Sequence, residues 1–153
     1  MKGLRGLTLI EVIIVIGIIS ILSSFLSFNS YRSRNLVSLD TNVSSLINDI
    51  KNQQLQGMTG YSLGGIYFEE SRYTIFHSLP YQNGDVNNFT ISLDTGNRFI
   101  NINLPNNQII FSSSSGMIEN FLDNQNSITL RNDFSNEEKT IHFNKFGVVY
   151  EIN

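Results

Sequence analysis

The chain has 153 residues, which is enough for one compact domain with at most one appended element. It contains no cysteine, so disulfide bonds and thiolate metal sites are excluded. From Leu36 onward it carries six basic and twelve acidic residues, a net charge of −6. Phosphate binding needs clustered Lys and Arg, so we expect no nucleic-acid partner for this chain alone.

The first segment combines a basic start with a long apolar run, and residues 12–31 contain no charged residue. A cleaved secretory signal is one explanation, but it requires two small residues spaced two apart after the run, and no such pair follows. A membrane-spanning helix is another. Residues 7–31 would form a helix of about 37 Å at about 1.5 Å per residue, which exceeds the hydrocarbon core of about 30 Å.

Glu11 is the feature that a simple membrane anchor does not explain, because a carboxylate in a bilayer is unfavourable by a few kcal/mol unless it is paired or interfacial. The residues leading to it are Lys2-Gly3-Leu4-Arg5-Gly6-Leu7-Thr8-Leu9-Ile10-Glu11. This run resembles the prepilin cleavage and methylation motif, in which a basic leader and a Gly precede Thr-Leu-Ile-Glu at a fixed distance. Leu7 stands where that family most often has Phe.

The resemblance to type IV pilin-like prepilins implies a role for each of these residues. Lys2 and Arg5 would belong to the basic leader. Prepilin peptidase would cut between Gly6 and Leu7 and methylate the new amine of Leu7. Glu11 would then pair with the amino terminus of a neighbouring subunit. Such a pair fixes register more than it adds stability, because desolvation offsets much of the Coulomb attraction.

Beyond Tyr31 the apolar residues become periodic and predict an amphipathic helix that packs on the following strands. The stripe, at alternating spacings of three and four, is Leu36, Leu39, Val43, Leu46 and Ile50. Neither Pro nor Gly interrupts residues 18–56, so we expect one helix through both halves, ended by Gly57 and Gly60.

Residues 57–153 are predicted to be β throughout, as short runs rich in Ile, Phe, Tyr, Val and Thr. The expected strands are 66–69, 72–77, 89–93, 99–103, 108–112, 127–130, 140–143 and 148–152. Turn residues separate them, for example Glu70-Ser71 and Lys145-Phe146-Gly147. Alternation in 99–104 and 140–143 indicates strands with one face turned inward.

The predicted fold class is α+β: a long N-terminal transmembrane or spine α-helix packed on an antiparallel β-sandwich, a pilin-like fold. The expected parts are a basic leader (1–6), a transmembrane or filament-core half-helix (7–31), an amphipathic half-helix (32–56) and a β-rich globular domain (57–153). This order is similar to the H-type minor pseudopilins and FimT-like minor pilins (the GspH/FimT type).

Other candidate sites are given structural interpretations. His77 and His142 lie 65 positions apart without acidic residues at ligand spacing, and Asp123-Asn124-Gln125-Asn126 lacks the Gly and distal Glu of a calcium loop. Residues 112–115 form no nucleophile elbow, and residues 60–65 are interpreted as a glycine-rich loop and not as a phosphate-binding site. Glu69 and Glu70 are interpreted as solvated charges beside a turn. We therefore expect no catalytic site, metal site or cofactor, and no enzymatic activity.

The predicted function is that of a structural subunit of a type IV pilus or a type II secretion pseudopilus. Its expected partners are prepilin peptidase, other pilin or pseudopilin subunits and inner-membrane lipids. The expected location is the bacterial inner membrane, single-pass with the globular domain outside the cytoplasm, and then the filament. The alternative is an unprocessed, membrane-tethered binding or adhesion module.

Overall fold

The computed structural model describes residues 9–60 and 64–152, apart from the side chains of residues 25–37 and 151–152. The elements, in chain order, are α1 (Leu9–Met58), β1 (Gly64–Glu69), β2 (Arg72–Phe76), β3 (Phe89–Ser92), β4 (Asn97–Asn103), η1 (Pro105–Asn107), β5 (Gln108–Phe111), β6 (Ser127–Asn132), β7 (Glu138–Phe143) and β8 (Val149–Ile152). The α+β class is confirmed, and each of the eight expected strands is present with ends shifted by no more than about two residues.

The chain divides into two compact units, residues 1–34 and residues 35–153, and α1 contributes to both. In the first unit the described part is helical from Leu9 onward. In the second unit the last turns of α1 pack with all eight strands. That the residues from 7 to 56 act as a single spine stays a prediction.

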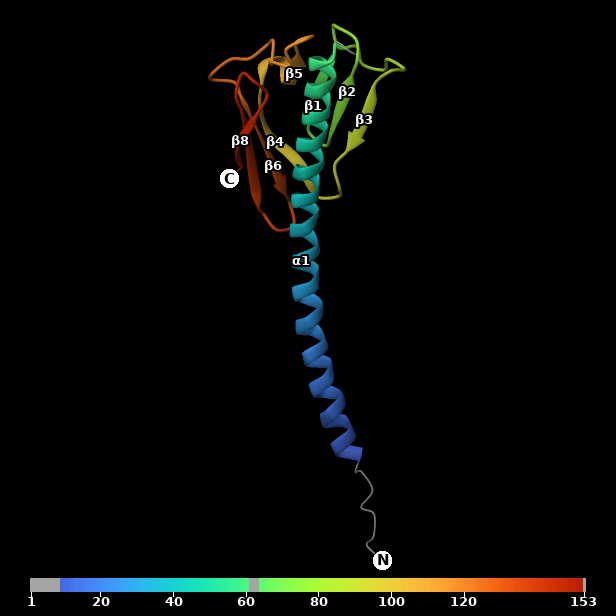
Figure 1. Ribbon diagram of the computed structural model, residues 1–153. Coiled ribbons are helices and arrows are strands. Elements are labelled where there is room, and N and C mark those ends of the chain that lie inside the picture. The colour runs from blue at the N-terminus through green and yellow to red at the C-terminus, as the bar shows by residue number, and fades with distance from the viewer. Residues whose placement is uncertain (1–8, 61–63, 153) are drawn as a thin grey trace, which may run out of the picture. The chain divides into compact units, whose positions relative to one another are not determined.

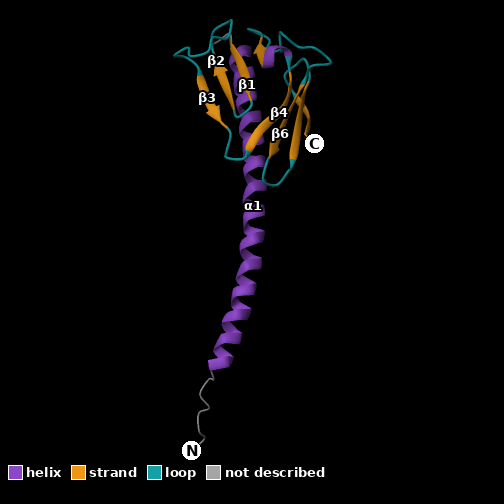
Figure 2. Ribbon diagram, turned by 180° about the vertical axis from the view of Figure 1, so that it is seen from behind, coloured by secondary structure: helices purple, strands orange, loops and turns teal. Residues whose placement is uncertain are grey.

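The second unit contains two antiparallel sheets of four strands, in the orders β3-β2-β1-β5 and β4-β6-β7-β8. The expected Glu70-Ser71 turn joins β1 and β2, whose register pairs Glu69 with Arg72. The expected Lys145-Phe146-Gly147 turn joins β7 and β8. The two opposed views show β1, β2 and β3 on one side of the C-terminal part of α1, and β4 and β6 on the other (Figures 1 and 2).

The hydrophobic core lies where this part of α1 meets both sheets. The predicted stripe is confirmed at Leu39, Val43, Leu46 and Ile50, each of which is buried. The side chain of Leu36, the first member of the stripe, lies outside the described residues. The stripe packs against Ile66, Phe68, Tyr73, Ile75 and Ile109 of one sheet and Phe99, Ile128, Leu130, Ile141 and Phe143 of the other. Burial of one helix face by two sheets is the main stabilising contact of this unit.

Polar contacts fix α1 to the sheets and their connecting loops at several positions along the helix. Lys139 of β7 pairs with Asp40, and the side-chain amide of Asn42 donates to Asp94 Oδ2 over 2.7 Å. Near the C-terminal end of α1, the amide of Gln54 donates to the carbonyl oxygens of Gly116 and Phe146. These contacts hold the helix in one register relative to the sheets.

The alternation predicted for residues 99–104 is interrupted by a β-bulge. The β4–β6 register shifts between Phe99 and Asn101, and the side chain of Ile100, expected to point inward, is exposed. Phe99 and Leu104 are both buried, although positions five apart in a regular strand point to opposite faces. The extra residue of the bulge allows both side chains to reach the core.

Two expectations about glycine were wrong in part. Gly64 and Gly65 begin β1 instead of belonging to a loop. Glycine is needed at both positions because the neighbouring strands approach too closely for a side chain. A Cβ on Gly65 would lie 1.9 Å from the carbonyl oxygen of Ile109 on β5. Gly57 does not stop α1, which continues to Met58. Gly60, with a φ of +70°, takes the left-handed conformation that commonly follows a helix end.

Candidate functional site

Among the motif residues with a proposed role, Glu11 is the one whose side chain the structure describes. It lies in the first turn of α1 and is exposed. A carboxylate there interacts favourably with the unpaired N–H groups at the start of a helix. Lys2, Arg5, Gly6 and Leu7 lie outside the described residues, so their roles stay predictions.

The apolar residues that follow Glu11 are exposed on every side of the helix. Eleven large apolar side chains between Leu9 and Leu22 are exposed, from 42% at Val12 to 81% at Leu9. With 3.6 residues per turn, their positions leave no polar stripe around the axis. A helix that is apolar all round is typical of one enclosed by lipid or by other helices.

Serine hydroxyls in this segment are turned back onto the helix. Ser20 Oγ donates to the carbonyl oxygen of Ile16, and Ser24 Oγ donates to that of Ser20, both over 2.9 Å. Because each hydroxyl is satisfied four residues back, Ser20 and Ser24 keep the segment compatible with an apolar environment. Within the residues that can be assessed, no helix combines the length and the hydropathy of a membrane span.

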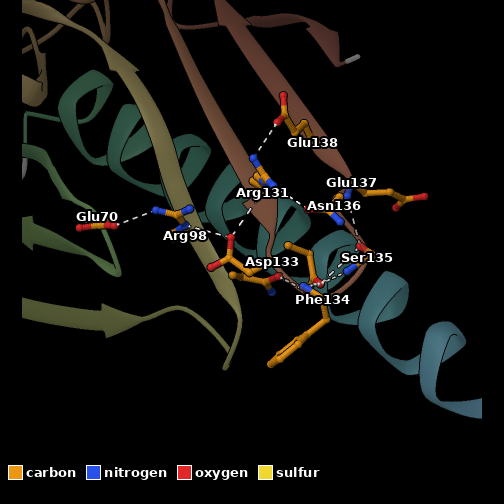
Figure 3. A network of polar contacts seen from close by, with 11 residues as sticks. Glu70, Arg98, Arg131, Asp133, Phe134, Ser135, Asn136, Glu137 and Glu138 are labelled. Carbon is orange, nitrogen blue, oxygen red and sulfur yellow. Dashed lines mark hydrogen bonds and ion pairs between the residues drawn. The ribbon is translucent and has the colours of Figure 1, made fainter.

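A network of charged side chains occupies the surface of the second unit (Figure 3). Arg98 on β4 donates to Asp133 over 3.0 Å and to Glu70 over 3.2 Å. Arg131, its register partner on β6, donates to Asn136 over 2.6 Å and lies 3.7 Å from Glu138. The hydrogen bonds that Arg98 donates to Asp133 and Glu70 raise the pKa of Arg98 above its ordinary value.

Glu70 is solvent-exposed beside its turn, as expected, but it also pairs with Arg98, and Glu69 is bound by Arg72 over 2.6 Å. No local sequence pattern indicates the pairing of Glu70 with Arg98, because Arg98 belongs to a different sheet. A polar groove beside the network is lined by Glu70, Arg98, Asn107 and Arg131, among others. Both guanidinium groups lie close to carboxylates, so the network links strands, although Arg131 Nε is buried and has no hydrogen-bond partner within the described structure. Exposed pairs of this kind contribute little to stability.

The residues considered as metal ligands are not brought together. His77 is exposed just after β2, whereas the His142 ring lies 5.8 Å from the ring of Tyr150 on β8. Asp123 is exposed in a turn in which the Gln125 N–H donates to the Leu122 carbonyl oxygen. In the described parts of the chain, no group of three or more His, Cys, Asp or Glu side chains could hold a metal ion.

Comparison with known families identifies the N-terminal segment. Residues 1–27 match the family of the prokaryotic N-terminal methylation motif. No curated protein and no solved structure matches the chain. The matched residues include the leader, Glu11 and most of the apolar segment, and they support a type IV pilin-like prepilin. Such a motif indicates a membrane-anchored pilus precursor, processed by prepilin peptidase and assembled with other pilins, and suggests a structural subunit instead of an enzyme.

Proposed function

We propose that this protein is a minor pilin or pseudopilin, a structural subunit of a type IV pilus or a type II secretion pseudopilus. Prepilin peptidase cuts it between Gly6 and Leu7 and methylates the amine of Leu7, and it then assembles through its N-terminal helix. The observation that carries the proposal is the methylation motif over residues 1–27, followed by a helix that exposes apolar side chains on all sides.

Before assembly, the apolar segment spans the inner membrane and holds the subunit there. The leader, with Lys2 and Arg5, stays on the cytoplasmic side, because basic residues next to a span favour that side. The unit built of two sheets then lies outside the cytoplasm. Removal of residues 1–6 takes away both leader charges, which leaves the mature chain starting at the apolar helix.

During assembly, Glu11 pairs with the cationic amine of Leu7 on a neighbouring subunit. The two positions are four residues apart, or about 6 Å along a helix, so pairing between subunits sets an axial offset. In the low dielectric of lipid or of a helix bundle, an unpaired Glu11 carboxylate is strongly disfavoured. A subunit that docks in the wrong register leaves this charge unpaired, which gives the pair its selectivity.

The assignment to the H-type and FimT-like minor subunits draws its support from the second unit. A helix stripe buried by two antiparallel sheets, a first hairpin of β1 and β2 and a last hairpin of β7 and β8 are the features expected of that subfamily. None of these features depends on the N-terminal motif, so the subfamily assignment can fail while the prepilin proposal stands.

Processing is tested by mass spectrometry of the chain extracted from membranes of its native host. We expect a mature N-terminus at Leu7, with the added mass of one methyl group, and a full-length precursor when the peptidase gene is deleted. An intact Met1 in cells with active peptidase, or a start other than Leu7, overturns the proposed cleavage.

Assembly is tested by Glu11→Val, with Glu119→Val as the matched control because Glu119 is an exposed glutamate of the second unit. We expect Glu11→Val to reach the membrane in normal amounts but to be lost from filaments, or to reduce secretion, while Glu119→Val behaves as the wild type. The alternative of an unprocessed binding or adhesion module predicts that both variants keep normal location and activity.

A further inference from the structure

The face of the sheet β3-β2-β1-β5 that is turned away from α1 carries a small polar cavity. Tyr73 on β2 contacts Asp49 of α1, so Thr74, the next residue, points to the opposite face. The segment 77–88 between β2 and β3 (Figure 1) contributes most of the remaining wall. The cavity has a volume of about 140 Å³ and is lined by Glu69, Arg72, Thr74, Tyr81, Asn83, Gly84, Asp85, Asn88 and Thr90.

Aromatic rings fix the segment 77–88 against this face. The ring of Tyr81 stacks on that of Tyr67, with centroids 4.3 Å apart and planes inclined by 15°. Phe76 packs against the same ring, with a centroid distance of 5.3 Å. Stacked and tilted ring pairs at these distances are favourable arrangements. Tyr81 therefore forms a pre-positioned aromatic part of the cavity wall.

Hydrogen-bonding groups of both kinds line the cavity. The hydroxyl oxygens of Thr74 and Thr90 lie 3.0 Å apart on neighbouring strands. The amide of Asn88 donates to the carbonyl oxygen of Gln82 over 2.7 Å, which fixes its orientation. Its Oδ1 atom is buried and has no hydrogen-bond partner within the described structure. Buried acceptors nearly always have a donor, so this atom indicates that a donor from outside the chain belongs here.

Two acidic side chains and one basic side chain line the cavity, and all three are already engaged. Arg72 makes a two-point contact with Glu69, over 2.6 and 2.9 Å. Asp85 accepts hydrogen bonds from the Asn87 N–H over 2.9 Å and from Ser78 Oγ over 3.0 Å. A cationic ligand would meet Arg72, and an anionic ligand would meet Glu69 and Asp85. This arrangement favours an uncharged ligand that offers several donors and acceptors.

We propose that this cavity binds one neutral sugar ring of a glycan. Sugar hydroxyls both donate and accept, which matches the Thr, Asn and carboxylate groups, and the C–H face of a sugar packs on an aromatic ring such as Tyr81. The volume lies below the roughly 300 Å³ at which drug-sized pockets begin, as a single ring requires. Glycan recognition goes beyond the proposed assembly function, because filament packing through the N-terminal helix does not need it.

The test uses the full-length chain in a zwitterionic detergent, because alkyl glycoside detergents carry a sugar that would compete. The probes are glucose, galactose, mannose, N-acetylglucosamine and N-acetylgalactosamine, measured by saturation-transfer NMR. We expect at least one to bind with a dissociation constant of about 1 mM, the weak range of small ligands. Amide resonances of residues 72–90 should shift on titration, which locates the site without any substitution.

Asn83→Ala and Thr90→Val remove single polar groups from exposed positions in the wall, and Asn101→Ala on β4 is the matched control outside it. Each wall variant should weaken binding about three- to tenfold, the effect of one lost hydrogen bond. The control should bind as the wild type. Binding of no sugar, shifts confined to other residues, or unchanged affinity in both wall variants overturns the proposal and leaves a cavity that holds water only. Cleavage after Gly6 and filament assembly are read by separate measurements, so the two proposals fail independently.

Discussion

Tyr73 on β2 donates its phenolic hydroxyl to the carboxylate of Asp49 on α1, with 2.6 Å between Oη and Oδ2. The tyrosine is fully buried, and the bond crosses from a sheet to the helix inside the second unit. Hydrogen bonds to charged groups contribute about 1.5–3 kcal/mol. We expect Tyr73→Phe to lower the free energy of unfolding by about that amount while leaving the ring packing intact. Urea unfolding of the full-length chain in detergent, followed by tyrosine fluorescence because the protein has no Trp, measures the change.

A double-mutant cycle with Asp49→Ala separates this bond from other effects of the substitution. If the bond accounts for the loss, Tyr73→Phe should have a much smaller effect in the Asp49→Ala background. Equal effects in the two backgrounds would show that the hydroxyl contributes nothing through Asp49.

Burial, and then the hydrogen bond to Asp49, raise the pKa of Tyr73 above its ordinary value of 10.0. The folded state therefore keeps this proton at a pH where the unfolded chain loses it. The stabilisation from Tyr73 is complete below pH 10 and declines as the pH rises further, by at most about 1.4 kcal/mol per pH unit. We expect Tyr73→Phe to flatten the dependence of unfolding free energy on pH above about 10. Identical slopes for the variant and the wild type would contradict this assignment.

Leu46 and Leu55 lie on the same helix in opposite environments and form a natural pair for substitution. Leu46 is fully buried between the two sheets, whereas Leu55 is 59% exposed. Leu46→Ala should lower the free energy of unfolding of the second unit by about 2–5 kcal/mol through lost contacts and a residual cavity. Leu55→Ala should change it by no more than about 0.5 kcal/mol. Comparable losses in chemical denaturation would mean that the stripe does not form the core contact.

The elements that could be predicted from sequence depend on local patterns. The strands have alternating or β-branched residues between turn residues, and the stripe from Leu39 to Ile50 follows the helical repeat, so neighbours along the chain were sufficient. Which strands lie next to one another in the two sheets could not be predicted from such local patterns. No residue near β5 in the sequence indicates that it pairs with β1. The bulge at Ile100 is linked to the burial of both Phe99 and Leu104, which lie on either side of it in the sequence.

The same distinction applies to the candidate sites. The N-terminal motif is contiguous, so Gly6, Leu7 and Glu11 were recognisable from sequence alone, although the proposed partner of Glu11 belongs to another subunit. The polar cavity combines residues of β1, β2 and β3 with the segment around Tyr81, and no short run of sequence contains it. The Arg98–Glu70 pair likewise joins two sheets that only the fold brings together.

Alanine at Gly65 and alanine at Gly17 should have different effects on the stability of the second unit. A Cβ at Gly65 would lie 1.9 Å from the Ile109 carbonyl oxygen, so Gly65→Ala must push β1 and β5 apart. We expect a loss of at least about 3 kcal/mol, the upper range for overpacking. A Cβ at Gly17 would meet no atom within 4 Å, and alanine favours a helix by about 1 kcal/mol over glycine.

Thermal unfolding followed by the near-ultraviolet tyrosine signal reports mainly on the second unit, because five of the six tyrosines belong to it. Gly65→Ala should lower the transition temperature markedly, while Gly17→Ala should leave it unchanged. A normal transition for Gly65→Ala would show that β1 and β5 can separate without loss, and the close approach would then not explain the glycine. A lowered transition for Gly17→Ala would instead mean that the apolar segment contributes to the stability of the sheets.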